Sequence, residues 1–269
     1  MNSLLKYKRA YALGLKSKLE YRFDFLMSIA SCAFTLIVLT TLWRAIFSNS
    51  GAEKLYGYSF QQMLFYVISS TLLSKMITTD IMNVISNDIK DGGLNKFLVQ
   101  PFSYSKYRLS VLLGEKTCEA LIILILIIAL LIILPLASNS IIGFSSFLLS
   151  LIPILLSTLL NFYLSFILAT LAFWVTDTFY LNFGLNVVIL ILSGAIFPID
   201  VLPKMIVNIS RFLPFQYIIF FPVKVLTGNY LTRELSLGIL IQVGYILILG
   251  IASKLFWNYG VSKHIAVGG

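Results

Sequence analysis

SNDIKDGGLNKFLVQPFSYSKYRLSVLLGEKTCE, residues 86–119, is the long polar interruption in a mostly apolar chain. Within it, the paired glycines of Asp91-Gly92-Gly93 must end the preceding helix, because glycine loses the most backbone freedom on ordering. Residues 94–100 can then form about two helical turns. Pro101 closes them, because the residue before a proline is disfavoured in the α region. The stretch therefore predicts a helix break followed by a short helix.

The short helix has one apolar face. Leu94, Phe97 and Leu98 stand at positions i, i+3 and i+4, and Asn95 and Lys96 lie on the other side. Two turns are too short to be stable alone in water. The apolar face must therefore rest either on lipid headgroups or on another protein.

The composition is typical of a membrane protein. Of the 269 residues, 59% are hydrophobic and only 12% are charged, whereas a soluble domain carries about 25% charged residues. A spanning helix needs about 20 apolar residues, so about six such segments with their connections fill this length. We therefore expect an all-α integral membrane protein with six transmembrane helices, forming a single domain over residues 1–269.

The expected segments follow one another along the chain. Residues 1–24 form an amphipathic helix at the membrane interface, because leucines and tyrosines fall opposite most of the basic residues; an ordinary basic tail is the alternative. A cytoplasmic coupling segment fills residues 85–119. The spans occupy residues 25–84 (25–47 and about 60–84), residues 120–197 (120–136, 144–175 and 181–196), and the start of residues 235–269 (about 235–257).

The second span is the most polar of the six. A charge near the bilayer centre costs about 2.5 to 3.5 kcal/mol on insertion scales, so this helix should face protein or water. Lys75, Thr79 and Asp80 are candidates for lining a wet path or an interface with a second chain. A structural ion pair or a polar contact within the bundle is the alternative role for Lys75 and Asp80.

Residues 198–234 are too apolar for an aqueous loop, yet prolines interrupt them. Irregular backbone at membrane depth persists only where protein or a wet cavity satisfies its polar groups. We therefore expect a hairpin that enters the membrane from outside without crossing it, and the family resemblance given below implies that it acts as an external gate. Its marker residues are Gly194, Pro198, Pro203, Pro214 and Pro222.

The basic residues predict the orientation. Thirteen of the 20 Lys and Arg residues fall in the two ends and the segment around residues 86–119, six fall in the opposite connections, and Lys75 lies inside a span. Basic residues concentrate in cytoplasmic loops, so both ends and the coupling segment are expected in the cytoplasm. The net charge of +9 is spread between apolar runs, which favours anionic lipid over nucleic acid as its partner.

Catalytic motifs are missing from the sequence. The single histidine, His264, cannot supply HExxH or a Ser-His-Asp set, and Asp80 is the only carboxylate well inside an expected span. Gly114-Glu115-Lys116-Thr117 lacks the GxxxxGK[ST] pattern of a nucleotide-binding loop. We therefore expect no catalytic residue, metal or cofactor in this chain.

Two stretches carry a family resemblance. NDIKDGGLNKFLVQPFSYSKY, residues 87–107, resembles the charged-x-x-Gly-x-Leu-x-x-Leu-x-x-Pro-x-Ser pattern after the second helix of ABC-2 type transporter permeases. SGAIFPIDVLPKMIVNISRFLPFQYI, residues 193–218, resembles that family's Ser-Gly, Phe-Pro, Leu-Pro and Leu-Pro segment between helices five and six. The paired glycines depart from the single glycine that is commoner in the family.

The resemblance implies the permease subunit of an ABC exporter in a bacterial or archaeal plasma membrane. Two cytosolic ABC ATPase subunits would bind ATP and Mg, a second permease chain, identical or sister, would complete the path, and the substrate would be an amphipathic drug, peptide or lipid-linked glycan. The residues implied in ATPase coupling are Asp88, Asp91, Gly92, Gly93, Leu94, Phe97, Leu98 and Pro101. A secondary transporter, a membrane assembly protein and a lipid-modifying enzyme remain as alternatives. The scarcity of intramembrane ionisable residues and of repeats disfavours the first of these.

Overall fold

The computed structural model describes residues 3–20, 22–137, 144–175, 178–228 and 230–263. These residues are almost entirely helical, which confirms the expected helical class. The helices are α1 (Ser3–Glu20), α2 (Arg22–Ser50), α3 (Phe60–Ile77), α4 (Ile81–Lys90), α5 (Asn95–Leu98), α6 (Tyr104–Ala137), α7 (Phe144–Thr170), α8 (Phe179–Leu192), α9 (Lys204–Ser210), α10 (Phe220–Leu226) and α11 (Thr232–Lys263). Three short 3-10 turns, η1 (Leu171–Phe173), η2 (Ile199–Val201) and η3 (Phe215–Tyr217), join some of them, and the strands β1 (Lys54–Leu55) and β2 (Tyr58–Ser59) form an antiparallel pair.

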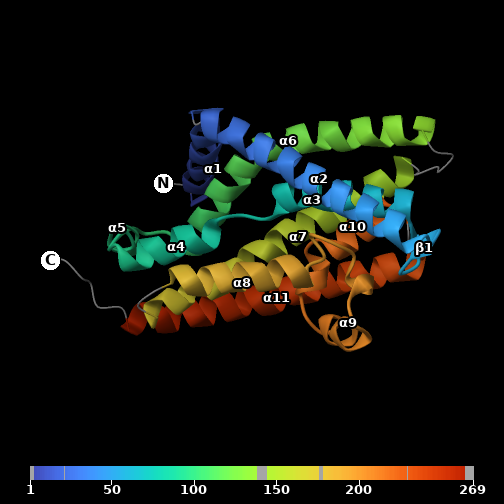
Figure 1. Cartoon of the computed structure of the whole chain (residues 1–269). Coiled ribbons are helices and arrows are strands. Elements are labelled where there is room, and N and C mark those ends of the chain that lie inside the picture. The colour runs from blue at the N-terminus through green and yellow to red at the C-terminus, as the bar shows by residue number, and fades with distance from the viewer. Residues whose placement is uncertain (1–2, 21, 138–143, 176–177, 229, 264–269) are drawn as a thin grey trace.

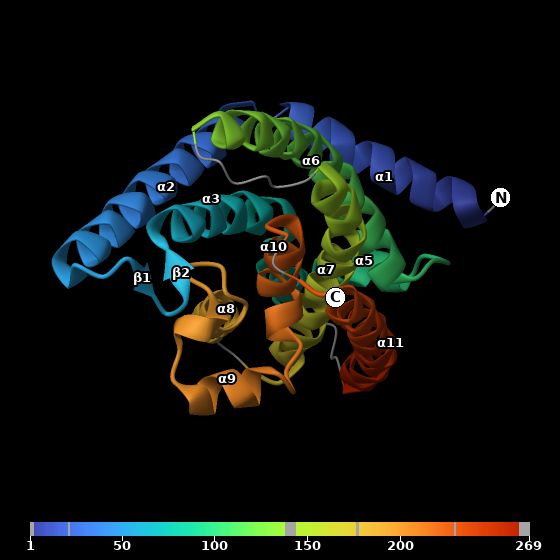
Figure 2. The same cartoon turned by 90° about the vertical axis from the view of Figure 1, so that its right-hand side faces the viewer.

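The long helices share one direction. In Figure 1, α2, α6, α7 and α11 run along the bundle, whereas α1 crosses this direction. The helices α1 and α5 and the end of α11 gather at one end of the bundle, and the β1–β2 pair lies toward the other. Figure 2, turned by 90°, shows α7 and α10 surrounded by the remaining helices.

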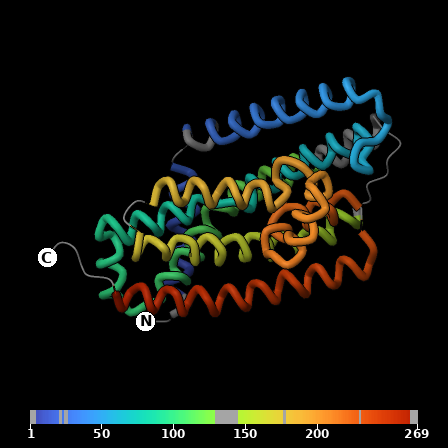
Figure 3. The backbone as a smooth tube through the Cα atoms, turned by 60° about the horizontal axis from the view of Figure 1, so that its bottom comes forward, coloured from blue at the N-terminus to red at the C-terminus, as the bar shows by residue number. Residues whose placement is uncertain are grey.

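Three described helices are long and apolar enough to span a membrane: Met27–Ser50, Ser145–Phe173 and Thr232–Lys263. Only 11% of the apolar stretch of the first and of the last is buried within the chain, compared with 56% for the second. Figure 3 shows the first and last of them, α2 and α11, on opposite outer sides. Their exposed apolar faces need lipid or another subunit, because water would solvate them poorly. The full count of six spans stays a prediction.

The core lies around α7. Phe162 and Phe166 are fully buried where α7 meets α4 and the start of α6, and Trp257 of α11 packs on Phe166 with ring centroids 5.3 Å apart. Pro153 lies inside α7, and the helix continues past it.

The expected second span over residues 60–84 is broken in the structure. The helix α3 ends at Ile77 and α4 begins at Ile81, with Thr78 extended between them. The expectation of one uninterrupted helix is therefore wrong. The sequence pattern could not show this, because the interactions that stabilise the break come from other helices, as the cavity described below shows.

The helix α1 packs against the first half of α6. A Cβ added to Gly14 would lie 2.1 Å from the carbonyl oxygen of Val111, and one added to Gly114 would lie 2.1 Å from that of Tyr11. Only glycine permits such a close approach of two helices. The hydroxyls of Tyr11 and Thr117, 2.8 Å apart, add a hydrogen bond across the contact.

Candidate functional site

The segment between α4 and α6 forms a compact tip. Its paired glycines have different roles: Gly92 adopts a positive φ of 73°, whereas a Cβ on Gly93 would lie 3.1 Å from a carboxylate oxygen of Asp88. The backbone N–H of Leu94 donates to the carbonyl of Asp88 at 2.7 Å. The predicted helix break at these glycines is confirmed, because α4 ends at Lys90. The following helix, α5, is a single turn and shorter than expected.

The apolar face expected at the tip is divided in the structure. Leu94 is fully buried and Phe97 is partly buried, so both side chains pack inward on the chain itself. Leu98 is 42% exposed and the neighbouring Val99 is 84% exposed. Leu94, Phe97 and Leu98 therefore do not present one shared surface. The exposed apolar side chains at the tip are those of Leu98 and Val99.

A cluster of rings and charges holds the tip in place. Arg108 pairs with Asp88, and its Nε donates to the hydroxyl of Tyr104 at 3.0 Å, while that hydroxyl donates to Asp88. Tyr104 stacks on Trp257 with a centroid distance of 4.7 Å, which ties the tip to α11. Burial, supported by the hydrogen bond to Asp88, raises the pKa of Tyr104, so its hydroxyl stays protonated. Asp88 was predicted here, but Tyr104 and Arg108 were missed, although their i, i+4 spacing was visible.

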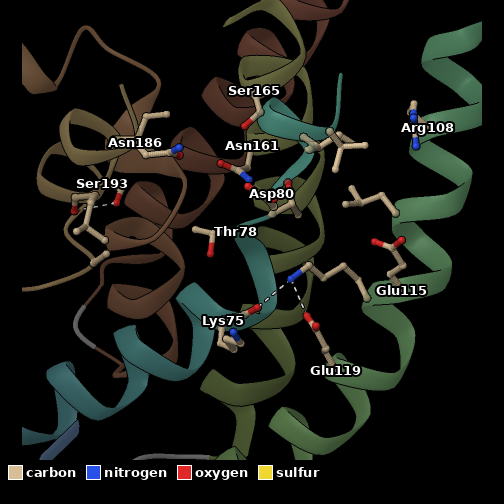
Figure 4. A pocket seen from close by; sticks show the side chains of 18 of the residues that line it. Lys75, Thr78, Asp80, Arg108, Glu115, Glu119, Asn161, Ser165, Asn186 and Ser193 are labelled. Carbon is tan, nitrogen blue, oxygen red and sulfur yellow. Dashed lines mark hydrogen bonds and ion pairs between the residues drawn. The ribbon is translucent and has the colours of Figure 1, made fainter. Parts of the chain in front are cut away.

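A cavity of about 620 Å³ opens beside the α3–α4 break, among α6, α7 and α8. Figure 4 shows Lys75, Thr78 and Asp80 on one side of it, Glu115 and Glu119 on α6, and Asn161 on α7. The three residues predicted as path candidates, Lys75, Thr79 and Asp80, all line this cavity. The structure thus brings them together with polar groups of four other helices, α1, α6, α7 and α8.

The broken end of α3 receives hydrogen bonds from neighbouring helices. The carbonyl of Lys75 accepts a hydrogen bond from Nζ of Lys116 at 2.9 Å, and that of Ile77 accepts one from Nδ2 of Asn161 at 3.3 Å. The hydroxyl of Thr78 donates to the carbonyl of Ser74 at 2.6 Å. A helix end leaves carbonyls unpaired and partly negative, so a lysine there is doubly favourable. These contacts stabilise the break.

Glu119 is the centre of an ion-pair network at the edge of the cavity. Its carboxylate lies 2.7 Å from Nζ of Lys116 and 2.8 Å from Nζ of Lys18 on α1. Burial acts to raise the pKa of Glu119, but the two lysines outweigh burial and lower it. In the same helix, burial raises the pKa of Glu115. The i, i+3 spacing of Lys116 and Glu119 on α6 was visible in the sequence, but their contacts with Lys18 on α1 and with the end of α3 were not.

Lys75 and Asp80 do not form an ion pair with each other within the described part of the chain. Asp80 is exposed and accepts a hydrogen bond from Nδ2 of Asn83 at 2.6 Å. The Nζ of Lys75 has no carboxylate within 4.0 Å among the residues that the structure describes. Of the two alternative roles, an ion pair is seen for neither residue among the described parts of the chain, whereas Asp80 has a polar contact with Asn83.

The segment after α8 is folded into the bundle. Gly194 adopts a φ of 78°. Its carbonyl accepts a hydrogen bond from the hydroxyl of Tyr66 at 2.6 Å, and the carbonyl of Ala195 accepts one from the hydroxyl of Ser70 at 3.0 Å. Nε2 of Gln242 on α11 donates to the carbonyl of Tyr217 at 2.9 Å. Side chains of other helices thus form hydrogen bonds with the backbone carbonyls of this irregular segment. Such hydrogen bonds are required where irregular backbone lies at membrane depth.

The proline markers of this segment lie at helix boundaries. Pro198, Pro203 and Pro214 directly precede η2, α9 and η3, whereas Pro222 lies inside α10. Residues 204–210 and 215–226 form a pair of helical pieces bent by 75°. This geometry fits either a broken span or a re-entrant hairpin.

Comparison with known protein families decides the assignment. Residues 33–268 match the family model described as ABC-2 family transporter protein. The chain belongs to this family. An ABC-2 protein is the multi-pass membrane permease of an ABC transporter, has no ATPase site of its own and associates with an ABC ATPase. No curated protein matches the chain.

Among the described residues, no group of three or more His, Cys, Asp or Glu side chains could hold a metal ion. His264 lies outside the described residues. The Gly114-Glu115-Lys116-Thr117 stretch lies within the helix α6, so it does not form a phosphate-binding loop.

Proposed function

We propose that the chain is the permease subunit of an ATP-driven exporter whose ATPase docks on the exposed tip formed by Leu98 and Val99. Val99 is 84% exposed at the end of a segment that is otherwise anchored by Leu94, Tyr104 and Arg108. This observation carries the proposal, because an exposed apolar residue on a rigid support suits a protein partner. The tip then transmits force to α4 and α11 through the Asp88 and Trp257 contacts.

The charges at this same end of the bundle indicate how the chain is oriented in the membrane. The basic residues of α1 and of residues 86–119 surround the tip, and such residues favour the cytoplasmic side. The tip therefore faces the cytoplasm, where two copies of the ATPase bind ATP and Mg. The β1–β2 pair and the segment around α9 face outward, and this segment acts as a re-entrant external gate.

The cavity beside the α3–α4 break is proposed as the inner part of the translocation path. A discontinuous helix with polar groups around it is typical of transport sites at membrane depth. Polar groups such as Asn161 and Lys75 lie beside apolar ones such as Val187 and Leu190, which suits an amphipathic substrate. A second permease chain, identical or a sister subunit, closes the open side.

Affinity purification of the tagged chain from its own cells tests the proposal. We expect an ABC ATPase to copurify with the wild type, and Leu98→Asp or Val99→Asp to reduce its recovery by about tenfold or more, because docking would bury an unpaired carboxylate. Lys106→Asp, at an exposed position of α6 outside the tip, is the matched control. Full recovery with both tip variants would refute the docking site. An absence of any ATPase with the wild type would refute ATP-driven transport.

A further inference from the structure

A second pocket, of about 450 Å³, lies between α1 and the tip segment, away from the cavity described above. Three basic side chains line it, Lys6 and Arg9 of α1 and Lys96 of α5, together with the rings of Phe102 and Tyr107. None of the described residues that line it is acidic. Its volume is within the range of small-molecule sites, which is about 300–1,000 Å³.

The positive charges of this basic pocket have no counter-charge from the part of the chain that the structure describes. Over the ranges that the structure describes, none of Lys6, Arg9 and Lys96 has a carboxylate within 4.0 Å. Three cations around one hollow repel each other unless an anion joins them. The pocket therefore has the electrostatics of an anion site.

The walls of the basic pocket are joined across two distant parts of the sequence. Nζ of Lys6 donates to the carbonyl of Pro101 at 3.2 Å, and the backbone N–H of Ser103 donates to the hydroxyl of Tyr7 at 3.3 Å. Nζ of Lys96 lies 5.1 Å from the ring centroid of Phe97, a cation–π contact. The hollow is thus built by contacts between α1 and the tip segment rather than left by a loose surface loop.

The surroundings of the pocket favour a lipid as the source of the anion. Leu13 lines the pocket and is 54% exposed, so an apolar surface adjoins the cations. The same exposed face of α1 carries Leu5 and Leu19 beside Lys8 and Lys16. Alternating leucines and lysines on a helix that crosses the direction of the spans are typical of the membrane interface (Figure 1).

We propose that the pocket between α1 and α5 binds the phosphate of an anionic phospholipid headgroup. Lys6, Arg9 and Lys96 hold the phosphate, and Leu13 contacts the adjoining acyl chain. Basic pockets between helices at a membrane surface bind such headgroups. A bound lipid would link α1 to the segment that carries Leu98 and Val99. The proposal does not depend on which protein docks there.

Amine labelling in lipid nanodiscs tests the site through the reactivity of single lysines. In discs of phosphatidylglycerol, Lys96 should react several-fold more slowly with an amine reagent than in discs of phosphatidylcholine, while the exposed Lys106 should react equally in both. Equal labelling of Lys96 in both discs would overturn the proposal. Inorganic phosphate added to phosphatidylcholine discs should leave Lys96 reactive. Protection by phosphate alone would overturn the assignment to a lipid headgroup.

Paired variants test the charges. Native mass spectrometry of the detergent-purified chain should show that the double variant Arg9→Gln, Lys96→Gln binds phosphatidylglycerol about 10- to 30-fold more weakly. The control double variant, Lys8→Gln with Lys16→Gln, removes the same amount of charge from α1 outside the pocket. It should bind phosphatidylglycerol normally. Rescue by Arg9→Lys, Lys96→Arg supports the charge requirement. Equal loss in both double variants would indicate general attraction and overturn the site. The proposal would also be overturned if the pocket variant bound lipid normally but no longer copurified with an ATPase. That result would mean that the pocket contacts a protein.

Discussion

Nζ of Lys116 on α6 donates a hydrogen bond to the backbone carbonyl of Lys75 at 2.9 Å, at the broken end of α3. The same ammonium group pairs with Glu119 at 2.7 Å. One side chain thus both caps the end of α3 and contributes to the network that joins α1, α3 and α6. The break beside the cavity depends on a residue about 40 positions away in sequence.

Replacing this cap should destabilise the fold. We expect Lys116→Met to lower the free energy of unfolding by about 2–4 kcal/mol, because it leaves a carbonyl unpaired and Glu119 with one partner fewer. Lys224→Met is the control, because the pair between Lys224 and Glu234 is exposed, and such pairs contribute about 0–1 kcal/mol. Chemical denaturation in detergent measures both. Equal, small losses would show that Lys116 is not a structural cap.

The Glu119 network predicts a pH dependence. The pKa of Glu119 is lowered in the folded chain, so its stabilising effect is fully present above the ordinary glutamate value of 4.5 and is lost as the pH falls through the lower, folded value. Glu119→Gln should therefore reduce stability equally at pH 8 and pH 6, and the difference from wild type should shrink below about pH 4.5. Unfolding midpoints measured across this range check the sign. A difference that grew on acidification would contradict the pairing.

The contact between α1 and α6 predicts a contrast between glycines. Gly14→Ala and Gly114→Ala should each destabilise the chain by about 1–3 kcal/mol, because the added methyl would overlap backbone atoms. Gly184→Ala and Gly244→Ala are matched controls in α8 and α11, where an added Cβ would meet nothing within 4 Å. These controls should be neutral or stabilising by up to about 1 kcal/mol, since alanine favours a helix. If all four variants behave alike, the close approach of α1 and α6 is wrong.

Thiol labelling tests the proposed re-entrant segment. With Cys32 and Cys118 replaced by serine, cysteines at Asp200 and Tyr230 should both react with an impermeant reagent added outside the cell. The hydroxyl of Tyr58, in β2, donates to Asp200 at 2.9 Å, which places this residue beside the external strand pair. A cysteine at Lys106 should react only after permeabilisation. Labelling of only one of the two external positions would mean that the segment crosses the membrane.

The sequence alone determined that the molecule is a membrane protein and where the helix α4 ends. Its deficit of charge required a membrane environment, and Gly92 and Gly93 ended α4 as predicted, because glycine's backbone properties act locally. The stretches around residues 87–107 and 193–218 were sufficient to indicate the ABC-2 family. These are properties of composition and of short runs, which need no knowledge of distant neighbours.

Only the tertiary structure decided which of these residues are buried and which are exposed. Leu94 and Leu98 look equivalent in a helical pattern, yet one is buried against α4 and α7 and the other is exposed. The break after Ile77 and the link from Glu119 to α1 were likewise not visible, because each involves side chains of other helices. A helix can end in an apolar environment only when other groups satisfy its carbonyls, and Lys116 and Asn161, which donate to the carbonyls of Lys75 and Ile77, belong to α6 and α7.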